Sequence, residues 1–523
     1  MSQAFDPSST PTQPQPQVVS RSEVIFSLNG ELIRAQASDA PLMLADFLRT
    51  RRNLPGTKIV CAEGDCGACT LLKAAPYRHS AKPQFLPVNS CIIPVASLDG
   101  AQLVTVDGLA DQTTLRGQSN SSAPYERKGL HPAQEAMVKC HGSQCGFCTP
   151  GFVMALAGLV EKRLERGDTE SPIEEKEAKN ALTANLCRCT GYSPIIEAAC
   201  SIDLKTCSPI RSRFENPALQ EKLQKAILSP LHLRAEEFEY YAPTSLESAG
   251  AYLNQNPSAE LISGATDLGV VHNKRKKRLK HLLSLHLIPE LHQITRVGKS
   301  RLRIGAKVTL SEVRDFVKGE LIPEFAQFLD LFASPQIKNQ ATLVGNLATA
   351  SPIGDTPPFL LVAGTTVQAY SVSSSGQIQI REIPIESFFI SYRKTALEPG
   401  ELITSIEIDI PEKGEILRLQ KVSQRKDLDI STVNVAFRLH LDPQTRKISK
   451  PRVAYGGVAA TPKRISSVEN LLQGKTPDTV DLDQLAEGLH SEITPIDDLR
   501  SSQAFRRVTA ENILRHFIQE LAQ

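Results

Sequence analysis

The stretch Cys61-Ala-Glu-Gly64-Asp-Cys66-Gly67-Ala-Cys69 carries three cysteines in one short loop, and a fourth, Cys91, follows later in the chain. This spacing, with one distant cysteine, is the plant-type ferredoxin pattern, in which four thiolates hold a [2Fe–2S] cluster. The two glycines let the backbone curl around a cluster without Cβ clashes. They also leave backbone N–H groups free to point at its sulfurs. The sequence therefore predicts a first cluster held by Cys61, Cys66, Cys69 and Cys91.

A second set of four cysteines consists of Cys145-Gly-Phe-Cys148 and Cys187-Arg-Cys189. By spacing alone, a structural zinc site is an alternative for this second set, whereas the triplet of the first set is much less typical of zinc. A disulfide framework belongs to small secreted chains, and this chain has 523 residues and an odd number of cysteines, 11. Two clusters in one chain indicate electron transfer. We expect the remaining cysteines to be ordinary reduced thiols: Cys140, Cys200 and Cys207.

The composition excludes several other classes of protein. The net charge is only +2, which gives no reason to expect a nucleic-acid or an anionic-membrane partner. No apolar run approaches the ~20 residues of a transmembrane helix. Residues 1–21 are rich in Ser, Pro and Gln and lack the features of a signal peptide, so we interpret them as a disordered tail. Cluster-type cysteines without an export signal indicate the cytoplasm.

The first half of the chain divides into two expected domains. Residues 22–108 have the elements of a β-grasp ferredoxin domain. Strands are predicted over 24–28 and 31–35 around the turn Asn29-Gly30, and a short amphipathic helix over 41–49 leads to the Cys61 loop. Residues 109–205 are helical in composition and period, with helices expected over 134–139, 152–160 and about 173–183.

Two local signals place the second cysteine set at helix N-termini. Pro150 suits the first turn of a helix, and Ser193-Pro194 is typical of an N-cap followed by proline at the first helical position. Both cysteine pairs therefore lie just before a helix, where the dipole and free N–H groups favour thiolates and an anionic cluster.

The second half predicts a linker over 206–235, an α+β region over 236–413 and a final α+β domain over 414–523. The final domain should open with a strand near 416–419 and end in a helix over about 504–521. Two turns in the α+β region can offer N–H groups and hydroxyls to a phosphate: Leu261-Ile-Ser-Gly-Ala-Thr-Asp-Leu268 and the glycine-containing segment 341–355. Taken singly, each is also compatible with an ordinary tight turn.

The order of these motifs resembles the iron–sulfur and flavin portion of the xanthine dehydrogenase family of molybdenum hydroxylases. The resemblance spans roughly residues 22–520. Its most specific parts are His141-Gly-Ser-Gln-Cys-Gly-Phe-Cys-Thr-Pro-Gly151 and Asn185-Leu-Cys-Arg-Cys-Thr-Gly-Tyr192, which look like the family's second-cluster motifs. Residues 58–70 look like its ferredoxin loop, and 389–395 and 455–458 resemble later flavoprotein signatures.

The resemblance implies a multidomain α+β protein with a β-grasp [2Fe–2S] ferredoxin domain, a helical [2Fe–2S] domain, an α+β FAD-binding domain and an α+β C-terminal flavoprotein domain. It assigns the FAD pyrophosphate to the first turn, namely Leu261, Ile262, Ser263, Gly264, Ala265, Thr266, Asp267 and Leu268. It assigns a second FAD loop to Thr342, Gly345, Asn346 and Asp355, and further flavin contacts to Phe332, Ile403 and Lys421.

The chain departs from the family pattern at two positions. Val344 stands where the family usually has a glycine, and valine disfavours positive φ, so the second FAD loop is expected to lie slightly differently. Leu428 lies between Asp427 and Asp429, where family members often have adjacent acids. Between the two loops, the basic run 273–278 is interpreted as a solvated helix end, with dinucleotide steering or a nucleic-acid patch as alternatives.

By the same resemblance, the chain is expected to be the small subunit of a split xanthine dehydrogenase. It would pass electrons from molybdopterin on a partner large subunit through two clusters to FAD and on to NAD⁺ during hypoxanthine and xanthine oxidation to urate. The expected assembly is a heterotetramer, and no catalytic residue is assigned to this chain. The alternatives are the iron–sulfur and FAD subunit of another molybdenum hydroxylase, a stand-alone flavin–iron–sulfur reductase and a non-catalytic metal-binding scaffold.

Overall fold

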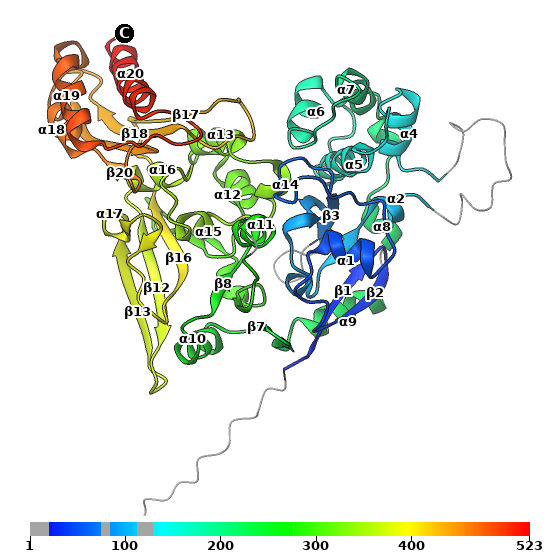
Figure 1. Ribbon diagram of the computed structural model, residues 1–523. Coiled ribbons are helices and arrows are strands. Elements are labelled where there is room, and N and C mark those ends of the chain that lie inside the picture. The colour runs from blue at the N-terminus through cyan, green and yellow to red at the C-terminus, as the bar shows by residue number, and fades with distance from the viewer. Residues whose placement is uncertain (1–19, 75–83, 112–128, 215, 276) are drawn as a thin grey trace, which may run out of the picture.

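The computed structural model describes residues 20–74, 84–111, 129–214, 216–275 and 277–523. The tail expected over 1–21 lies almost wholly outside these residues. The expected FAD-binding domain, residues 236–413, is called the flavin portion below. Figure 1 shows the ferredoxin and helical domains beside this flavin portion, and the C-terminal domain on top of the flavin portion. Within the described ranges, no helix combines the length and the apolar character needed to cross a membrane.

The ferredoxin domain is a five-stranded mixed sheet in the order β2-β1-β5-β3-β4. The predicted hairpin forms around Asn29 and Gly30, whose φ values of 52° and 85° are those of a tight turn with two left-handed residues. The elements are β1 (Glu23–Leu28), β2 (Glu31–Gln36), α1 (Leu44–Thr50), β3 (Thr70–Ala74), β4 (Leu86–Asn89), η1 (Ser90–Ile92), η2 (Val95–Leu98), β5 (Gln102–Val104) and α2 (Val106–Leu109). The helix predicted from residue 41 begins only at Leu44, because Met43 forms a β-bridge with Pro94.

The helical domain packs around the long helix α5, which is buried along most of its length. Its elements are α4 (Pro132–Lys139), α5 (Thr149–Glu165), α6 (Glu175–Ala181), α7 (Ser193–Cys200) and η3 (Leu204–Thr206). Pro150 lies in the first turn of α5, as predicted. The N-cap prediction for Ser193 is wrong by one residue. Tyr192, at φ 71°, is the N-cap of α7, and Ser193 is already helical.

The segment 206–235, expected to be a linker, is folded against the rest of the molecule. It contains α8 (Ile210–Phe214), α9 (Pro217–Ala226) and β6 (Leu231–Ala235). Arg213 of α8 donates hydrogen bonds to the carbonyls of Gly108 and Ala110 at 3.1 and 2.7 Å. Helix α9 packs on β1, and β6 is an edge strand of the next sheet, so these residues join the ferredoxin domain to the flavin portion.

The flavin portion contains two sheets, one of four strands in the order β6-β7-β9-β8 and one of five in the order β10-β11-β16-β12-β13. The small sheet shares its core with the ferredoxin domain. The large sheet shares a second core with the helices that lie between β11 and β12 in the chain. The first elements of this portion are β7 (Phe238–Ala242), α10 (Leu246–Gln255), β8 (Glu260–Ile262), α11 (Thr266–Arg275), β9 (His281–Ser284), η4 (Pro289–Leu291), β10 (Ile294–Val297) and β11 (Arg301–Gly305).

The large sheet is completed after a run of helices. These elements are α12 (Leu310–Val317), α13 (Pro323–Leu331), α14 (Pro335–Lys338), α15 (Leu343–Ala348), α16 (Pro357–Val362), β12 (Thr366–Val372), β13 (Ile378–Pro384), α17 (Ile385–Phe388), β14 (Phe389–Ser391), β15 (Lys394–Thr395) and β16 (Leu402–Asp409).

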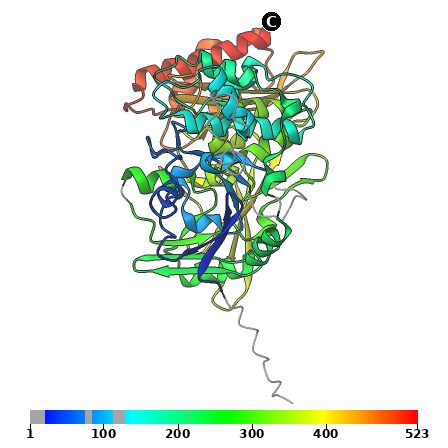
Figure 2. The ribbon, with the colours of Figure 1, turned by 90° about the vertical axis from the view of Figure 1, so that its right-hand side faces the viewer.

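The C-terminal domain is a four-stranded antiparallel sheet covered by helices on one side. Its elements are β17 (Glu415–Val422), β18 (Val433–Leu441), β19 (Ile448–Gly456), β20 (Lys463–Arg464), α18 (Ser466–Leu472), η5 (Pro477–Thr479), α19 (Leu482–Glu492) and α20 (Gln503–Ala522). In Figure 2 the C-terminal and helical domains lie at the same end of the molecule. The predicted first strand and last helix both form, and the predicted multidomain α+β fold is confirmed.

Candidate cofactor sites

The first cysteine set converges in the structure. Cys61 and Cys66 lie in the loop before β3, Cys69 immediately precedes that strand, and Cys91 lies in η1. The Cys61 thiol is in hydrogen-bond contact with those of Cys66 and Cys91, and Cys91 also contacts Cys69. Three of the four side chains are buried, with exposed fractions of 9%, 2% and 3% for Cys66, Cys69 and Cys91. Four thiols brought together from two separate segments fit a [2Fe–2S] cluster.

The loop of the first set has the backbone that such a cluster needs. Gly64 and Gly67 have φ values of 77° and 65°, and Ala62 is also left-handed at 55°. The N–H groups of Glu63 and Cys66 point at Cys61 Sγ, at 3.5 and 3.4 Å. Hydrogen bonds from Cys66 and Cys91 lower the pKa of the Cys61 thiol, and the same contacts raise the pKa of Cys66 and of Cys91.

The second cysteine set forms two contacting pairs at the surface. Cys148, the N-cap of α5, contacts Cys187, and Cys145 contacts Cys189. Burial, together with the contact to Cys187, raises the pKa of Cys148 to about 12. Burial opposes ionisation of Cys187, but hydrogen bonds, among them one from Thr190 Oγ1 at 3.2 Å, outweigh it and lower its pKa. The exposed members of the set are Cys145 and Cys189.

Neither set resembles a single-ion site. Across the described ranges, no group of three or more His, Cys, Asp or Glu side chains is placed around one metal ion. The thiols of the first set contact one another in a chain, and those of the second set form two pairs. A [2Fe–2S] core likewise spreads its four thiolates over two irons.

The two cysteine sets touch through backbone and amide groups. The N–H of Leu186, next to Cys187, donates to the carbonyl of Cys66 at 3.1 Å. Asn185 Nδ2 donates to the carbonyl of Gly67, also at 3.1 Å. A Cβ on Gly151, in the first turn of α5, would lie 2.3 Å from the same Gly67 oxygen, so only glycine permits this approach. The helical domain is therefore docked directly on the first cysteine loop.

Helix α14 brings the flavin portion to the same place. Gln336 Nε2 donates to Asn185 Oδ1 at 3.1 Å and lies 3.4 Å from Thr70 Oγ1. Burial lowers the pKa of Lys338 to about 7, and its Nζ donates to the carbonyl of Phe332 at 2.9 Å. The sequence analysis did not identify this helix, although Ser334-Pro335 has the N-cap and proline signal that could have found it.

The first FAD turn lies between β8 and α11, as expected for a phosphate-binding turn. Leu261 and Ile262 end β8, Ser263, Gly264 and Ala265 form the turn, and Thr266, Asp267 and Leu268 open α11. A Cβ on Gly264 would lie 2.1 Å from the carbonyl oxygen of Gln340, so this glycine lets the two FAD loops come together. Ala265 adopts φ 62°, a conformation that costs an alanine about 1–2 kcal/mol.

The residues of the turn fit a dinucleotide. The N-terminus of α11 presents backbone N–H groups, which suit a pyrophosphate. Beside the turn, Gln340 Oε1 is buried and has no hydrogen-bond partner among the described residues. A buried acceptor without a partner is costly in a finished site, so a bound donor group here would relieve it.

The second FAD loop is a short helix, α15, rather than an irregular turn. Thr342 caps it, accepting a hydrogen bond from the N–H of Gly345 at 3.0 Å. Val344 does not have positive φ and is 4% exposed in the core. Helical φ suits valine at this position, so Val344 is accommodated without positive φ. Asn346 Oδ1 accepts from Thr356 Oγ1 at 2.6 Å.

Two of the remaining predicted flavin residues form a buried ion pair. Lys421 Nζ lies 2.9 Å from Asp355 Oδ2, with side-chain exposures of 3% and 7%. Ser431 donates to the other carboxylate oxygen. Together these contacts join the second loop to β17 and to the segment between β17 and β18 of the C-terminal domain. Ile403 is buried in β16, and Phe332 is half-buried at the end of α13.

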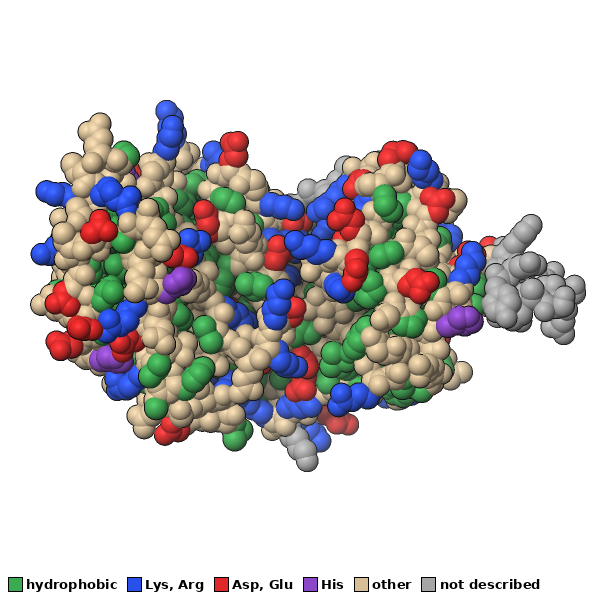
Figure 3. Space-filling model, turned by 90° about the horizontal axis from the view of Figure 1, so that it is seen from above, with side chains coloured by type: hydrophobic (Ala, Val, Ile, Leu, Met, Phe, Trp, Pro, Cys, Tyr) green, Lys and Arg blue, Asp and Glu red, His purple; other side chains and the backbone are tan. Residues whose placement is uncertain are grey.

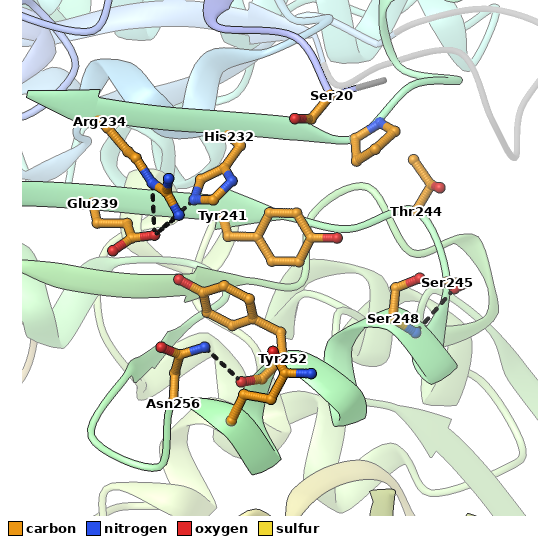
Figure 4. Close-up of a pocket in the computed structure, with 12 residues that line it drawn as sticks. Ser20, His232, Arg234, Glu239, Tyr241, Thr244, Ser245, Ser248, Tyr252 and Asn256 are labelled. Atoms are coloured by element: carbon orange, nitrogen blue, oxygen red, sulfur yellow. Dashed lines mark hydrogen bonds and ion pairs between the residues drawn. The ribbon is translucent and has the colours of Figure 1, made fainter. Parts of the chain in front are cut away.

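The structure also contains a half-open cavity of about 730 Å³ on the small sheet, away from the predicted site residues. Figure 4 shows its aromatic wall, formed by Tyr241 and Tyr252. The centroids of the two rings are 4.5 Å apart. Its charged groups pair with one another: Glu239 Oε1 accepts from His232 at 2.7 Å and from Arg234 at 3.2 Å. None of the predicted site residues lines this cavity.

Comparison with known proteins identifies the domains of the chain. Three family models match: the [2Fe-2S] binding domain over 114–200, the FAD binding domain in molybdopterin dehydrogenase over 236–412, and the CO dehydrogenase flavoprotein C-terminal domain over 418–521. The chain is 30% identical to xanthine dehydrogenase of Oryza sativa subsp. japonica over 540 residues and 31% identical to that of Drosophila pseudoobscura pseudoobscura over 528 residues. Each alignment covers 90% of this chain but only 37% of the relative.

A solved structure agrees with these matches. The chain is similar to a chain of carbon monoxide dehydrogenase from Hydrogenophaga pseudoflava, with a TM-score of 0.50 and 26% identity. The match covers 54% of this chain and 96% of the other. Together, the matched domains define an iron–sulfur flavoprotein that binds [2Fe–2S] and FAD. The chain belongs to the molybdenum hydroxylase family and corresponds to its iron–sulfur and FAD-binding part.

Proposed function

We propose that this chain is the electron-transfer subunit of a xanthine dehydrogenase. Electrons from a molybdopterin-bearing large subunit would enter at the second cysteine set, pass to the first set, and leave through FAD to NAD⁺ while hypoxanthine and xanthine become urate. The observation that carries this proposal is spatial order. The exposed second set touches the buried first set through Leu186, and the first set lies against the helix that opens at the FAD turn.

The cofactors supply the redox chemistry, and the protein supplies their binding, orientation and surroundings. The eight cysteines Cys61, Cys66, Cys69, Cys91, Cys145, Cys148, Cys187 and Cys189 would hold the two clusters. The two FAD loops would hold the dinucleotide, and Gly264 allows them to meet. No residue of this chain is assigned as a general acid or base.

The surroundings of the second set suit a partner protein. Phe147, Leu186 and Tyr192 are 50%, 45% and 39% exposed around the exposed cysteines, and Val138 is 39% exposed on α4. Apolar side chains grouped at a surface are typical of an interaction site. In Figure 3 the C-terminal and helical domains flank a notch along which Lys and Arg side chains gather. A large subunit seated near the second set, in a cytoplasmic heterotetramer, is part of the proposal.

The test uses the purified chain with and without a molybdopterin-bearing subunit. Alone, it should oxidise NADH with an artificial acceptor and show no xanthine-dependent reduction of NAD⁺. Adding the large subunit should restore that activity. Xanthine oxidation by the isolated chain would refute the division of labour between the subunits.

A matched pair of surface variants tests where the partner binds. Val138→Glu places a charge on the exposed face of α4, in the domain that carries the second set, and should weaken assembly with the large subunit. Ile378→Glu is the control, since Ile378 is also an exposed β-branched side chain, at 54% exposure, but lies on β13. Equal effects of both variants on assembly would place the partner elsewhere.

One other function has a specific observation in its favour. The structural similarity to carbon monoxide dehydrogenase is compatible with an iron–sulfur and FAD subunit of another molybdenum hydroxylase. In that case the assembled enzyme would leave xanthine untouched and reduce its acceptor with another substrate.

A further inference from the structure

Helix α11 connects the FAD turn to the first cysteine set. The helix begins at Thr266 in the turn and ends at Arg275. It packs against η1, which carries Cys91, and Figure 1 shows it between the ferredoxin domain and the rest of the flavin portion. One rigid element therefore reaches from the predicted phosphate site to the predicted cluster site.

The C-terminal half of α11 holds both segments of the first set through one side chain. Asn273 Nδ2 donates to the carbonyl of Ala62 at 2.9 Å and to the carbonyl of Cys91 at 2.8 Å. Both acceptors are carbonyl oxygens, so the amide must present its NH₂ group to them. Ala62 follows Cys61 and is left-handed, so its carbonyl direction depends on a partner that fixes it.

One turn earlier, the same face of α11 makes close backbone contact with η1. A Cβ on Gly269 would lie 2.3 Å from the carbonyl oxygen of Ile92. Val270 packs in a small cluster with Cys69, Cys91 and Ile92. Positions four residues apart share a helix face, so Gly269 and Asn273 together set how near α11 lies to the cysteines.

We propose that Asn273 is a positioning residue that fixes the first cysteine set relative to the FAD-binding helix, and thereby the gap that electrons cross between cluster and flavin. This inference rests on the proposed electron path and names a residue that controls it. The neighbouring ion pair does not serve the same purpose. Lys274 and Glu63 are 3.5 Å apart and 43% and 41% exposed, and an exposed pair contributes little.

The test is Asn273→Asp in the full chain with its cofactors. Aspartate keeps the size of the side chain but turns the donor into a carboxylate facing two carbonyl oxygens. After reduction with dithionite, the electron paramagnetic resonance signal of the first cluster should change shape or broaden. Electron exchange between that cluster and flavin, followed by stopped-flow absorbance, should slow, because the side chain that fixes the gap between them no longer holds the Ala62 and Cys91 carbonyls. FAD content and the signal of the second cluster should stay as in the wild type.

Two further variants keep the test decisive. Asn273→Ala removes the donors without adding charge and should give a smaller change of the same kind, even where the aspartate variant fails to fold. Asn254→Asp is the matched control, because Asn254 is an exposed asparagine on α10 of the same portion, and it should change nothing.

The outcomes distinguish a failure of the role of Asn273 from a failure of the proposed electron-transfer function. A wild-type chain without a first-cluster signal would refute the proposed electron path itself. A normal wild-type chain whose signal and exchange rate survive both Asn273 variants would overturn only the role of Asn273. Equal disturbance of both cluster signals would also overturn it, because a general loss of folding, rather than positioning, would then explain the effect.

Discussion

The two cysteine sets carry the same ligands but have opposite surroundings. In the first set, Cys69 and Cys91 are 2% and 3% exposed, and helices α11 and α14 of the flavin portion close the site from outside the ferredoxin domain. In the second set, Cys145 and Cys189 are exposed, and the nearby apolar side chains face solvent.

The difference shows which part of a site each level of structure determines. Cysteine spacing, a local property, places two or three thiols of each set in one short segment, and the fold of the domain brings the remaining thiols to them. Enclosure is a tertiary property, since the walls of the first set come from residues about 180 to 275 positions away in sequence, such as Asn273 and Gln336. An enclosed site suits an internal carrier, and an open one suits exchange with another protein.

The largest expected effect comes from removing one ligand of each set. Cys66→Ser should abolish the first of two electron paramagnetic resonance signals, and Cys187→Ser the second, because each four-cysteine set holds its own pair of irons. Each variant should retain about half of the iron of the wild type, which elemental analysis measures. If one substitution removes both signals, the sets are not independent sites.

The next largest effect is expected from a variant of the FAD turn, which should lose FAD but keep both clusters. In Thr266→Glu a carboxylate replaces a hydroxyl at the predicted pyrophosphate, and repulsion of about 1–4 kcal/mol corresponds to roughly fivefold to nearly a thousandfold weaker FAD binding. Flavin released per chain measures this, and both clusters should remain. Thr266→Ser keeps the hydroxyl and should keep FAD. Full FAD occupancy in the glutamate variant would mean that the phosphates lie elsewhere.

Chemical access should differ between the sets by a smaller factor. In protein stripped of iron, a maleimide should label Cys145 and Cys189 at least about tenfold faster than Cys69 and Cys91, because labelling the buried pair requires local opening of the structure. Mass spectrometry of timed samples gives the rate for each cysteine. Similar rates would show that the enclosure of the first set depends on the bound cluster.

The sequence was informative where the signal is local. The hairpin at Asn29-Gly30, the helices of the second domain and the turn at Gly264 all formed as predicted. The prediction of Ser193 as N-cap was wrong because Tyr192 takes that position. Tyr192 makes no side-chain cap and adopts φ 71°, a conformation that a tyrosine in the sequence does not suggest. The segment around Val344 is a helix, a conformation in which valine needs no positive φ.

Contacts between domains were beyond the reach of local patterns. Asn273 was predicted to belong to a solvated helix end, and the end of α11 is indeed exposed at Lys274 and Arg275. Its amide, however, turns toward Ala62 and Cys91, which a linear pattern cannot reveal. The segment 206–235 looked like a linker because it is polar, yet α8 and α9 gain their stability by packing on the ferredoxin domain.

The smallest expected effect concerns the acid response of the domain that carries the open set. Burial lowers the pKa of His131, the N-cap of α4, to about 4, and burial raises the pKa of Glu161, which accepts the N–H of Ile210 at 2.7 Å, to about 7. Between about pH 4.5 and 6.5 the unfolded chain holds a proton on the histidine that the folded chain lacks, so His131 makes stability rise with pH. Over the same range the folded chain holds a proton on Glu161 that the unfolded chain lacks, so Glu161 makes stability fall with pH. Each contributes a slope of about 1.4 kcal/mol per pH unit, and the two slopes oppose each other in the wild type.

Relative to the wild type, Glu161→Gln should lose stability on acidification, and His131→Asn, which keeps an N-cap, should gain it. The shift in melting temperature of each variant between pH 6.5 and 5, measured by calorimetry against the wild type, checks both signs. Shifts of the same sign in both variants would contradict the opposing protonation of His131 and Glu161.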